Sequence, residues 1–131
     1  MIIISSIALC AVVVFKEARG TQWEDQYRVA STIYNRAEET NSTVQQVIFK
    51  PHQFTSMKGI KPKTKFSSYK DMLAYYNIKD SDSYSTALIA CGYADNVRDE
   101  RLKYFHDKSI NKFKWSESKP IIISRDFKFY N

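Results

Sequence analysis

Glu17 is the residue whose type and position best suit catalysis, because it follows a long apolar stretch. Residues 3–16 are nearly all apolar and predict a helix that is buried on every side. Gly20 is the expected C-terminal cap of this helix. A carboxyl at the end of such a helix is partly removed from water, which disfavours its charged form and raises its pKa. A general acid in glycoside cleavage needs a raised pKa of this kind.

Other kinds of chemistry have little support in the sequence. Cys10 and Cys91 lie far apart within apolar helical patterns, which favours buried free thiols, although a disulfide between them stays open. His52 and His106 have no Cys or His at metal-binding spacing. We therefore expect no metal site.

The elements that must position Glu17 are mostly helical. Four further segments show helical periodicity or helix-capping residues: 23–37, 43–49, 69–76 and 83–95. Residues 51–68 lack any periodicity and predict a long loop, and loops of that length are usually functional. Residues 121–123 and 127–130 resemble short strands. The predicted fold class is mainly α (α+β), with a small β or irregular C-terminal part.

The length of 131 residues corresponds to one domain, so residues 1–131 are expected to form a single catalytic domain. The apolar run over residues 2–15 is shorter than the roughly 20 residues that cross a membrane. It also lacks a basic leading segment and a clear cleavage site, so we expect a buried first helix rather than a signal or an anchor.

The net charge of +6 predicts attraction to polyanions. Basic residues gather in two stretches, over residues 50–70 and 101–119. Nucleic acid, an anionic membrane and an anionic cell-wall polymer are all candidate partners, and charge does not choose among them.

Several motifs in order resemble the SleB-type cell-wall hydrolases. Phe15-Lys16-Glu17-Ala18-Arg19-Gly20, followed by a helix that ends in Asn35-Arg36, is similar to the opening of that family. Further matches are the Val44–Ile48 segment leading into Gln53-Phe54-Thr55, the Ala87–Gly92 helix, Tyr104-Phe105-His106, Trp115, and Phe127-Lys128-Phe129-Tyr130. The resemblance extends from about residue 8 to 130. Thr21, where the family usually has an acidic residue, and Ser124–Lys128 depart from it.

This resemblance implies a lysozyme-like catalytic fold that cleaves the bond between N-acetylmuramic acid and N-acetylglucosamine. As a lytic transglycosylase it would use Glu17 twice, first as acid and then as base, without a cofactor. A hydrolytic muramidase is the close alternative, with Asp107 or Asp126 as its base. The residues expected to bind substrate are Gln53, Phe54, Tyr104, His106 and Tyr130. Asn35 and Arg36 are expected to brace their helix.

Two other classes remain as alternatives. One is a basic, aromatic-rich domain that binds nucleic acid, although no nucleic-acid-binding motif is present, so no nucleic-acid partner is expected. The other is a structural component of a phage that has kept the fold, binds the cell wall and has lost catalysis. The expected partner is peptidoglycan, acted on by a monomer at the bacterial cell wall without stable membrane insertion. A phage lysin and a bacterial one both fit.

Overall fold

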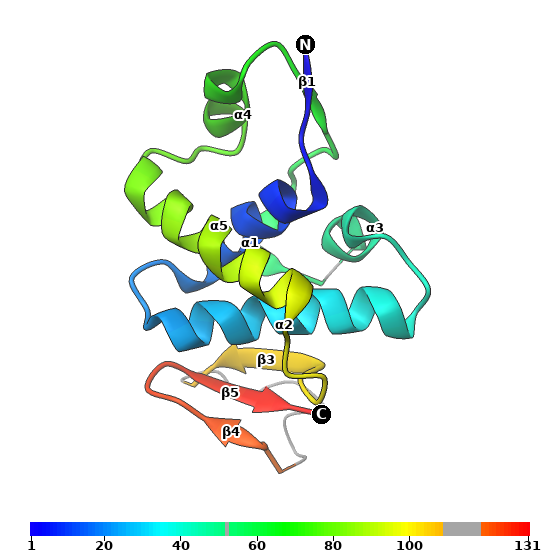
Figure 1. Cartoon of the computed structure of the whole chain (residues 1–131), viewed down its shortest axis with the longest axis vertical. Helices are drawn as coiled ribbons and strands as arrows, with labels where there is room; N and C mark the ends of the chain where they lie inside the picture. The colour runs from blue at the N-terminus through cyan, green and yellow to red at the C-terminus, as the bar shows by residue number, and fades with distance from the viewer. Residues whose placement is uncertain (52, 109–118) are drawn as a thin grey trace.

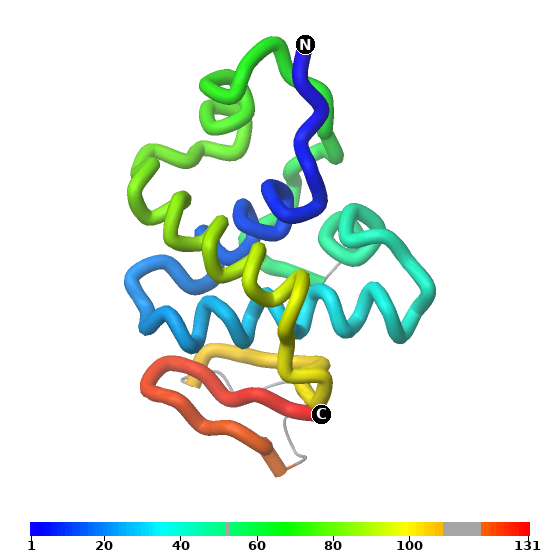
Figure 2. The backbone as a smooth tube through the Cα atoms, in the orientation of Figure 1, coloured from blue at the N-terminus to red at the C-terminus, as the bar shows by residue number. Residues whose placement is uncertain are grey.

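The computed structural model describes residues 1–51, 53–108 and 119–131, and in this part of the chain it is mainly helical (Figures 1 and 2). The helices are α1 (Ser6–Ala18), α2 (Trp23–Glu39), α3 (Val44–Phe49), the short 3-10 helix η1 (Thr55–Met57), α4 (Tyr69–Tyr75) and α5 (Ser81–Asn96). The strands are β1 (Ile2–Ile3), β2 (Lys65–Phe66), β3 (Tyr104–Asp107), β4 (Ile122–Ile123) and β5 (Phe127–Tyr130).

The elements stack in layers along the long axis, with the two chain ends at opposite ends of the molecule (Figure 1). Helix α2 lies in the middle: α1 and α5 pack on one side of it, and the sheet formed by β3, β5 and β4 lies on the other. Strands β1 and β2 form a separate antiparallel pair beside α4, beyond α1 and α5. Helix α1 is thus enclosed by other elements, as its sequence predicts.

Helix α1 starts later than the apolar run suggests. Ile2–Ile3 forms β1, and the helix begins only after Ser5, whose side chain accepts a hydrogen bond from the backbone N–H of Ala8. Serine is a preferred N-cap because its hydroxyl satisfies one of the free N–H groups of the first turn. At the other end, Gly20 has a φ of +79°, the left-handed conformation that favours glycine after a helix. The expected cap is therefore confirmed.

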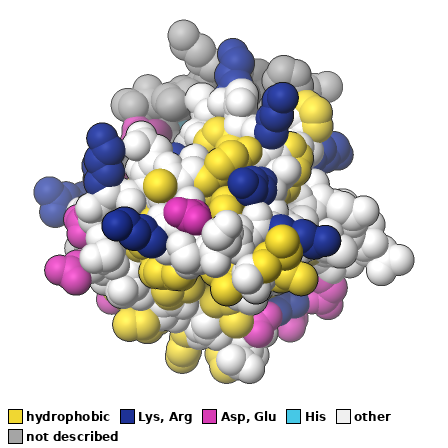
Figure 3. Space-filling view, turned by 90° about the horizontal axis from the view of Figure 1, so that it is seen from above, with side chains coloured by type: hydrophobic (Ala, Val, Ile, Leu, Met, Phe, Trp, Pro, Cys, Tyr) yellow, Lys and Arg dark blue, Asp and Glu magenta, His cyan; other side chains and the backbone are white. Residues whose placement is uncertain are grey.

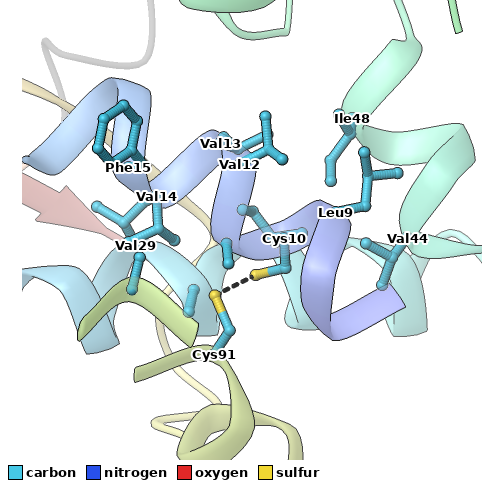
Figure 4. Packing of buried hydrophobic residues seen from close by; sticks show 14 of the residues in the cluster. Leu9, Cys10, Val12, Val13, Val14, Phe15, Val29, Val44, Ile48 and Cys91 are labelled. Carbon is cyan, nitrogen blue, oxygen red and sulfur yellow. Dashed lines mark hydrogen bonds between the residues drawn. The ribbon is translucent and has the colours of Figure 1, made fainter. Parts of the chain in front are cut away.

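The core is centred on α1 (Figure 4). All residues from Leu9 to Val14 have no exposed surface, and they pack against α5, α2 and α3. Cys10 and Cys91 are buried free thiols whose Sγ atoms lie 2.9 Å apart between α1 and α5. The prediction of buried free thiols is confirmed.

The expected loop over residues 51–68 contains two short elements, η1 and β2. Helix α3, which precedes this segment, is fixed by a capping box in which Thr43 and Gln46 satisfy each other's backbone N–H groups. Strand β3 had no counterpart in the sequence prediction, whereas β4 and β5 did. Among the described residues, no helix has both the length and the apolar character needed to cross a membrane.

Candidate active site

Glu17 occupies the last turn of α1, between the buried Phe15 and Ala18. Its side chain is half-buried. This burial raises the pKa of the Glu17 carboxyl, because a low-dielectric surrounding penalises the carboxylate more than the neutral acid. No charged side chain of the described residues contributes to the shift. The carboxyl therefore has the property expected of a general acid.

Ser56 is the residue that approaches Glu17 from outside α1. The buried side chains of Phe54 and Met57 anchor η1 against α1 and bring Ser56 to the end of that helix. The Ser56 hydroxyl lowers the pKa of Glu17, because a hydrogen-bond donor favours the carboxylate, but this effect is smaller than that of burial. Its Oγ atom is buried and completes no hydrogen bond among the described residues, so the hydroxyl acts on the Glu17 carboxyl as a nearby donor. No motif in the sequence singles out Ser56.

Replacing Ser56 by Ala is expected to raise the pKa of Glu17 further, because the variant keeps the burial and loses the donor. An acid-catalysed reaction needs protonated Glu17, so its rate falls as the pH rises through this pKa. The falling limb of the pH–rate profile of kcat/KM should therefore move to higher pH in the Ala variant, while Ser56→Thr should stay near the parent. An unmoved limb in the Ala variant would show that the hydroxyl does not act on Glu17.

Gln53 and Phe54 lead into η1, but their side chains are placed differently. Gln53 is half-buried, whereas Phe54 is buried and its ring centroid lies 6.3 Å from that of Phe105. Next to them, a hollow of about 530 Å³ extends along η1 and the end of α3. Thr55 and Met57 line it, whereas Glu17 does not. Because Ser56 stands between these two residues, the hollow and the carboxyl adjoin the same turn.

His106 and Tyr130 form a buried pair within the sheet. Their side chains are 3% and 2% exposed, and His106 Nε2 lies 2.8 Å from the Tyr130 hydroxyl. His106 Nδ1 lies 2.7 Å from the carbonyl oxygen of Asp107, which can only accept, so Nδ1 must carry the proton. In the neutral ring, Nε2 then accepts from Tyr130. No contact among the described residues joins either side chain to Glu17.

Tyr104 lies opposite Tyr130 in the β3–β5 register but is 38% exposed. Its ring centroid is 5.5 Å from Cζ of Arg36, whose other neighbour is the Phe54 ring at 5.6 Å. Arg36 therefore joins Phe54 and Tyr104, two of the residues expected to bind substrate. Sequence reasoning expected Arg36 only to brace α2.

Asn35 has the bracing role expected of it. Its Nδ2 donates to the carbonyl oxygens of Asp99 and Leu102, at 2.7 and 2.8 Å, and its Oδ1 accepts from Nε of Arg98 at 2.9 Å. These three bonds fix the chain between α5 and β3. Asn35 thereby helps to fix the start of β3, whose first residue is Tyr104.

The remaining candidates are set apart from Glu17. Asp107 ends β3, and Asp126 immediately precedes β5; no contact within the described part of the chain links either carboxylate to Glu17. His52 and Trp115 lie outside the described residues. In the ranges that the structure describes, no three His, Cys, Asp or Glu side chains gather as metal ligands.

The lysines of residues 50–70 do not all line the hollow beside η1. Lys50 and Lys58 line the hollow beside η1, whereas Lys63 lies over the rings of Phe66 and Tyr75, at 4.9 and 5.1 Å. On the face shown in Figure 3, Lys and Arg side chains are scattered among other residues rather than gathered in one patch. Of these lysines, Lys50 and Lys58 place basic charge beside the hollow, and Lys16 and Arg19 flank Glu17 in the sequence.

Comparison with known proteins identifies relatives of this chain. Residues 20–130 match the family model described as Cell Wall Hydrolase, a range that starts three residues after Glu17. The fold is similar to the crystal structure of the catalytic domain of the Bacillus cereus SleB protein, with a TM-score of 0.70 and 26% sequence identity, covering 96% of this chain and 89% of that one. No curated protein matches the sequence. The expected lysozyme-like, mainly α fold is confirmed. Because the family model covers most of the length of this chain, the chain belongs to the cell wall hydrolase family, which includes the SleB-type proteins.

Proposed function

We propose that this protein cleaves the glycan strands of peptidoglycan as a lytic transglycosylase, with Glu17 as its single catalytic carboxyl. Peptidoglycan is the substrate expected of a cell wall hydrolase. The observation that carries the proposal is the half-buried Glu17 carboxyl, whose pKa is raised by burial at the end of α1. A carboxyl of this kind keeps its proton closer to neutral pH than a solvated one.

In the first step, protonated Glu17 gives its proton to the glycosidic oxygen as the bond between that oxygen and C1 of N-acetylmuramic acid breaks. Positive charge develops on the sugar ring. The new Glu17 carboxylate then accepts the proton of the 6-hydroxyl while O6 bonds to C1. The product is a 1,6-anhydro ring, Glu17 is protonated again, and no water is consumed. One carboxyl thus serves as both acid and base.

The Ser56 hydroxyl suits the second step. It favours the Glu17 carboxylate, although burial has the larger and opposite effect, so it would stabilise the form that accepts the proton of the 6-hydroxyl. Removing it would bias the carboxyl toward the acid form. The expected result is the shift in the pH–rate profile given above.

Other residues are proposed to hold the glycan. The half-buried amide of Gln53 can hydrogen-bond an N-acetyl or hydroxyl group, and the exposed ring of Tyr104 can stack on a sugar face. Phe54 packs beneath this region. His106 and Tyr130 bond to each other within the sheet, and we assign them the support of Tyr104 from the neighbouring strand.

Mass spectrometry of digested peptidoglycan tests the reaction type. The expected products end in 1,6-anhydro-N-acetylmuramic acid, which is lighter by one water than the reducing sugar that a hydrolase leaves. Reducing ends in place of anhydro ends would identify a muramidase and require a second carboxylate. Unprocessed peptidoglycan together with bound nucleic acid would contradict glycan cleavage altogether.

A further inference from the structure

The guanidinium of Arg36 is held between two aromatic rings that come from distant parts of the chain. Its Cζ lies 5.6 Å from the ring centroid of Phe54 and 5.5 Å from that of Tyr104. Cations are attracted to ring faces, and arginine stacks on them through its planar group. Contact with two rings restricts the guanidinium more than contact with one would. The side chain is therefore held in place before any ligand arrives.

No carboxylate of the described residues forms an ion pair with Arg36, although the negative charge of Glu39 acts on the guanidinium from a greater distance. Arg28, Arg98 and Arg101 each form an ion pair, whereas Arg36 has neither an ion pair nor a side-chain hydrogen bond there. Glu39, three residues further along α2, pairs instead with Lys103 at 3.5 Å. A guanidinium has five N–H donors in a fixed plane. With its faces near rings, its N–H edge remains available to an external acceptor.

A small hollow beside Arg36 can receive such an acceptor. It has a volume of about 80 Å³ and lies between the end of α2 and α3, lined by Arg36, Thr40, Ser42, Gln46, Val47 and Lys50. Two of these residues are cationic and none is acidic. The space is too small for a sugar ring but large enough for a carboxylate. Lys50 also lines the larger hollow beside η1, so the two hollows are neighbours.

We propose that Arg36, assisted by Lys50, binds a carboxylate of the peptide stem attached to the glycan. This inference rests on the proposed function and adds a peptide subsite to it. Peptide stems leave the glycan at each muramic acid, so their carboxylates lie within reach of a site beside Phe54. A planar carboxylate fits the guanidinium edge with two parallel hydrogen bonds. Arg36 thus selects glycan strands that carry acidic stems.

The test compares two substrates and three variants. The substrates are soluble, uncrosslinked peptidoglycan strands, either unmodified or with their carboxyl groups converted to amides by carbodiimide and ammonia. The variants are Arg36→Gln, Arg36→Lys and, as a matched control, Arg101→Gln, which removes an exposed arginine that pairs with Asp99. Steady-state kinetics gives KM and kcat for each combination.

For the parent and Arg101→Gln, amidation of the substrate should raise KM about ten- to a hundredfold, the effect of losing hydrogen bonds between charged groups. Arg36→Gln should show the raised KM on the unmodified strands and no further rise on the amidated ones, with kcat near the parent value. Arg36→Lys should fall in between, because lysine keeps the charge but loses the planar fork.

Two results would overturn the subsite. One is that the parent enzyme has the same KM for both substrates. This comparison uses the parent alone and so does not depend on any variant folding. The other is an Arg36→Gln variant whose KM rises on amidation as much as the parent's. Both presuppose an active parent enzyme. If the parent releases no anhydro product from either substrate, the proposed function fails instead, so the two failures are distinguishable.

Discussion

Replacing Glu17 by Gln is expected to lower the rate of glycan cleavage by about a hundred- to ten-thousandfold, the usual loss when general acid–base catalysis is removed. Gln keeps the shape of the side chain but can neither donate nor reclaim a proton in the two steps. The measurement is release of soluble fragments from purified sacculi by the parent and the variant. Glu100→Gln, the same substitution at an exposed position, is the control and should cleave like the parent.

Glu17→Gln is expected to leave the stability of the fold intact, so a loss of activity in this variant reports on catalysis and not on folding. Burial raises the folded-state pKa of Glu17 above its ordinary value, so folding favours the protonated acid. Stability therefore falls as the pH rises through the ordinary and then the folded-state pKa. At neutral pH the Gln variant, which has no charge to bury, should unfold at the same temperature as the parent or higher. That difference should vanish at a pH below the ordinary pKa of glutamate.

Lysis by the Gln variant at the parental rate would contradict the assignment of Glu17. That result would favour a domain that only binds nucleic acid or cell wall, because such binding does not depend on a proton at this carboxyl. If Glu17→Gln lost both its activity and its cooperative unfolding transition, Glu17→Asp would be measured in its place. Asp keeps the proton but shortens the side chain by one methylene.

The helical part of the fold was predictable because its signals are local. The apolar run before Glu17, the cap at Gly20 and the capping residue Thr43 each lie within a few residues of the element that they define. A mainly α fold and the position of Glu17 at a helix end follow from these signals alone. Periodicity and caps need no knowledge of the tertiary structure.

The missed features depend on partners that are distant in the sequence. Ile2–Ile3 is a strand because it pairs with Lys65–Phe66, and a short apolar run does not distinguish a strand from the start of a helix. The role of His106 depends on Tyr130, and that of Arg36 depends on the rings of Phe54 and Tyr104. Ser56 reaches Glu17 only because η1 packs on α1. A motif locates such residues without revealing what they contact.

A variant that lacks residues 1–12 is expected not to fold, because these residues include the first half of α1, the helix at the centre of the core. Leu9, Cys10, Ala11 and Val12 have no exposed surface. The carbonyl oxygen of Ala8 accepts a 2.8 Å hydrogen bond from the buried Tyr84 of α5, which the deletion would leave without its acceptor.

The energies favour unfolding by a wide margin. Each fully buried Leu or Val contributes about 1.5–3 kcal/mol, and a domain has a total stability of only about 5–15 kcal/mol. The deletion removes Leu9 and Val12 and also exposes the faces of α2, α3 and α5 that pack on α1. Circular dichroism during heating should therefore show no cooperative transition. A variant that lacks only residues 1–3 loses β1 but keeps all of α1, and it should still unfold cooperatively. If the longer deletion unfolded cooperatively within a few degrees of the parent, α1 would not be the centre of the core, and the burial that raises the pKa of Glu17 would need another source.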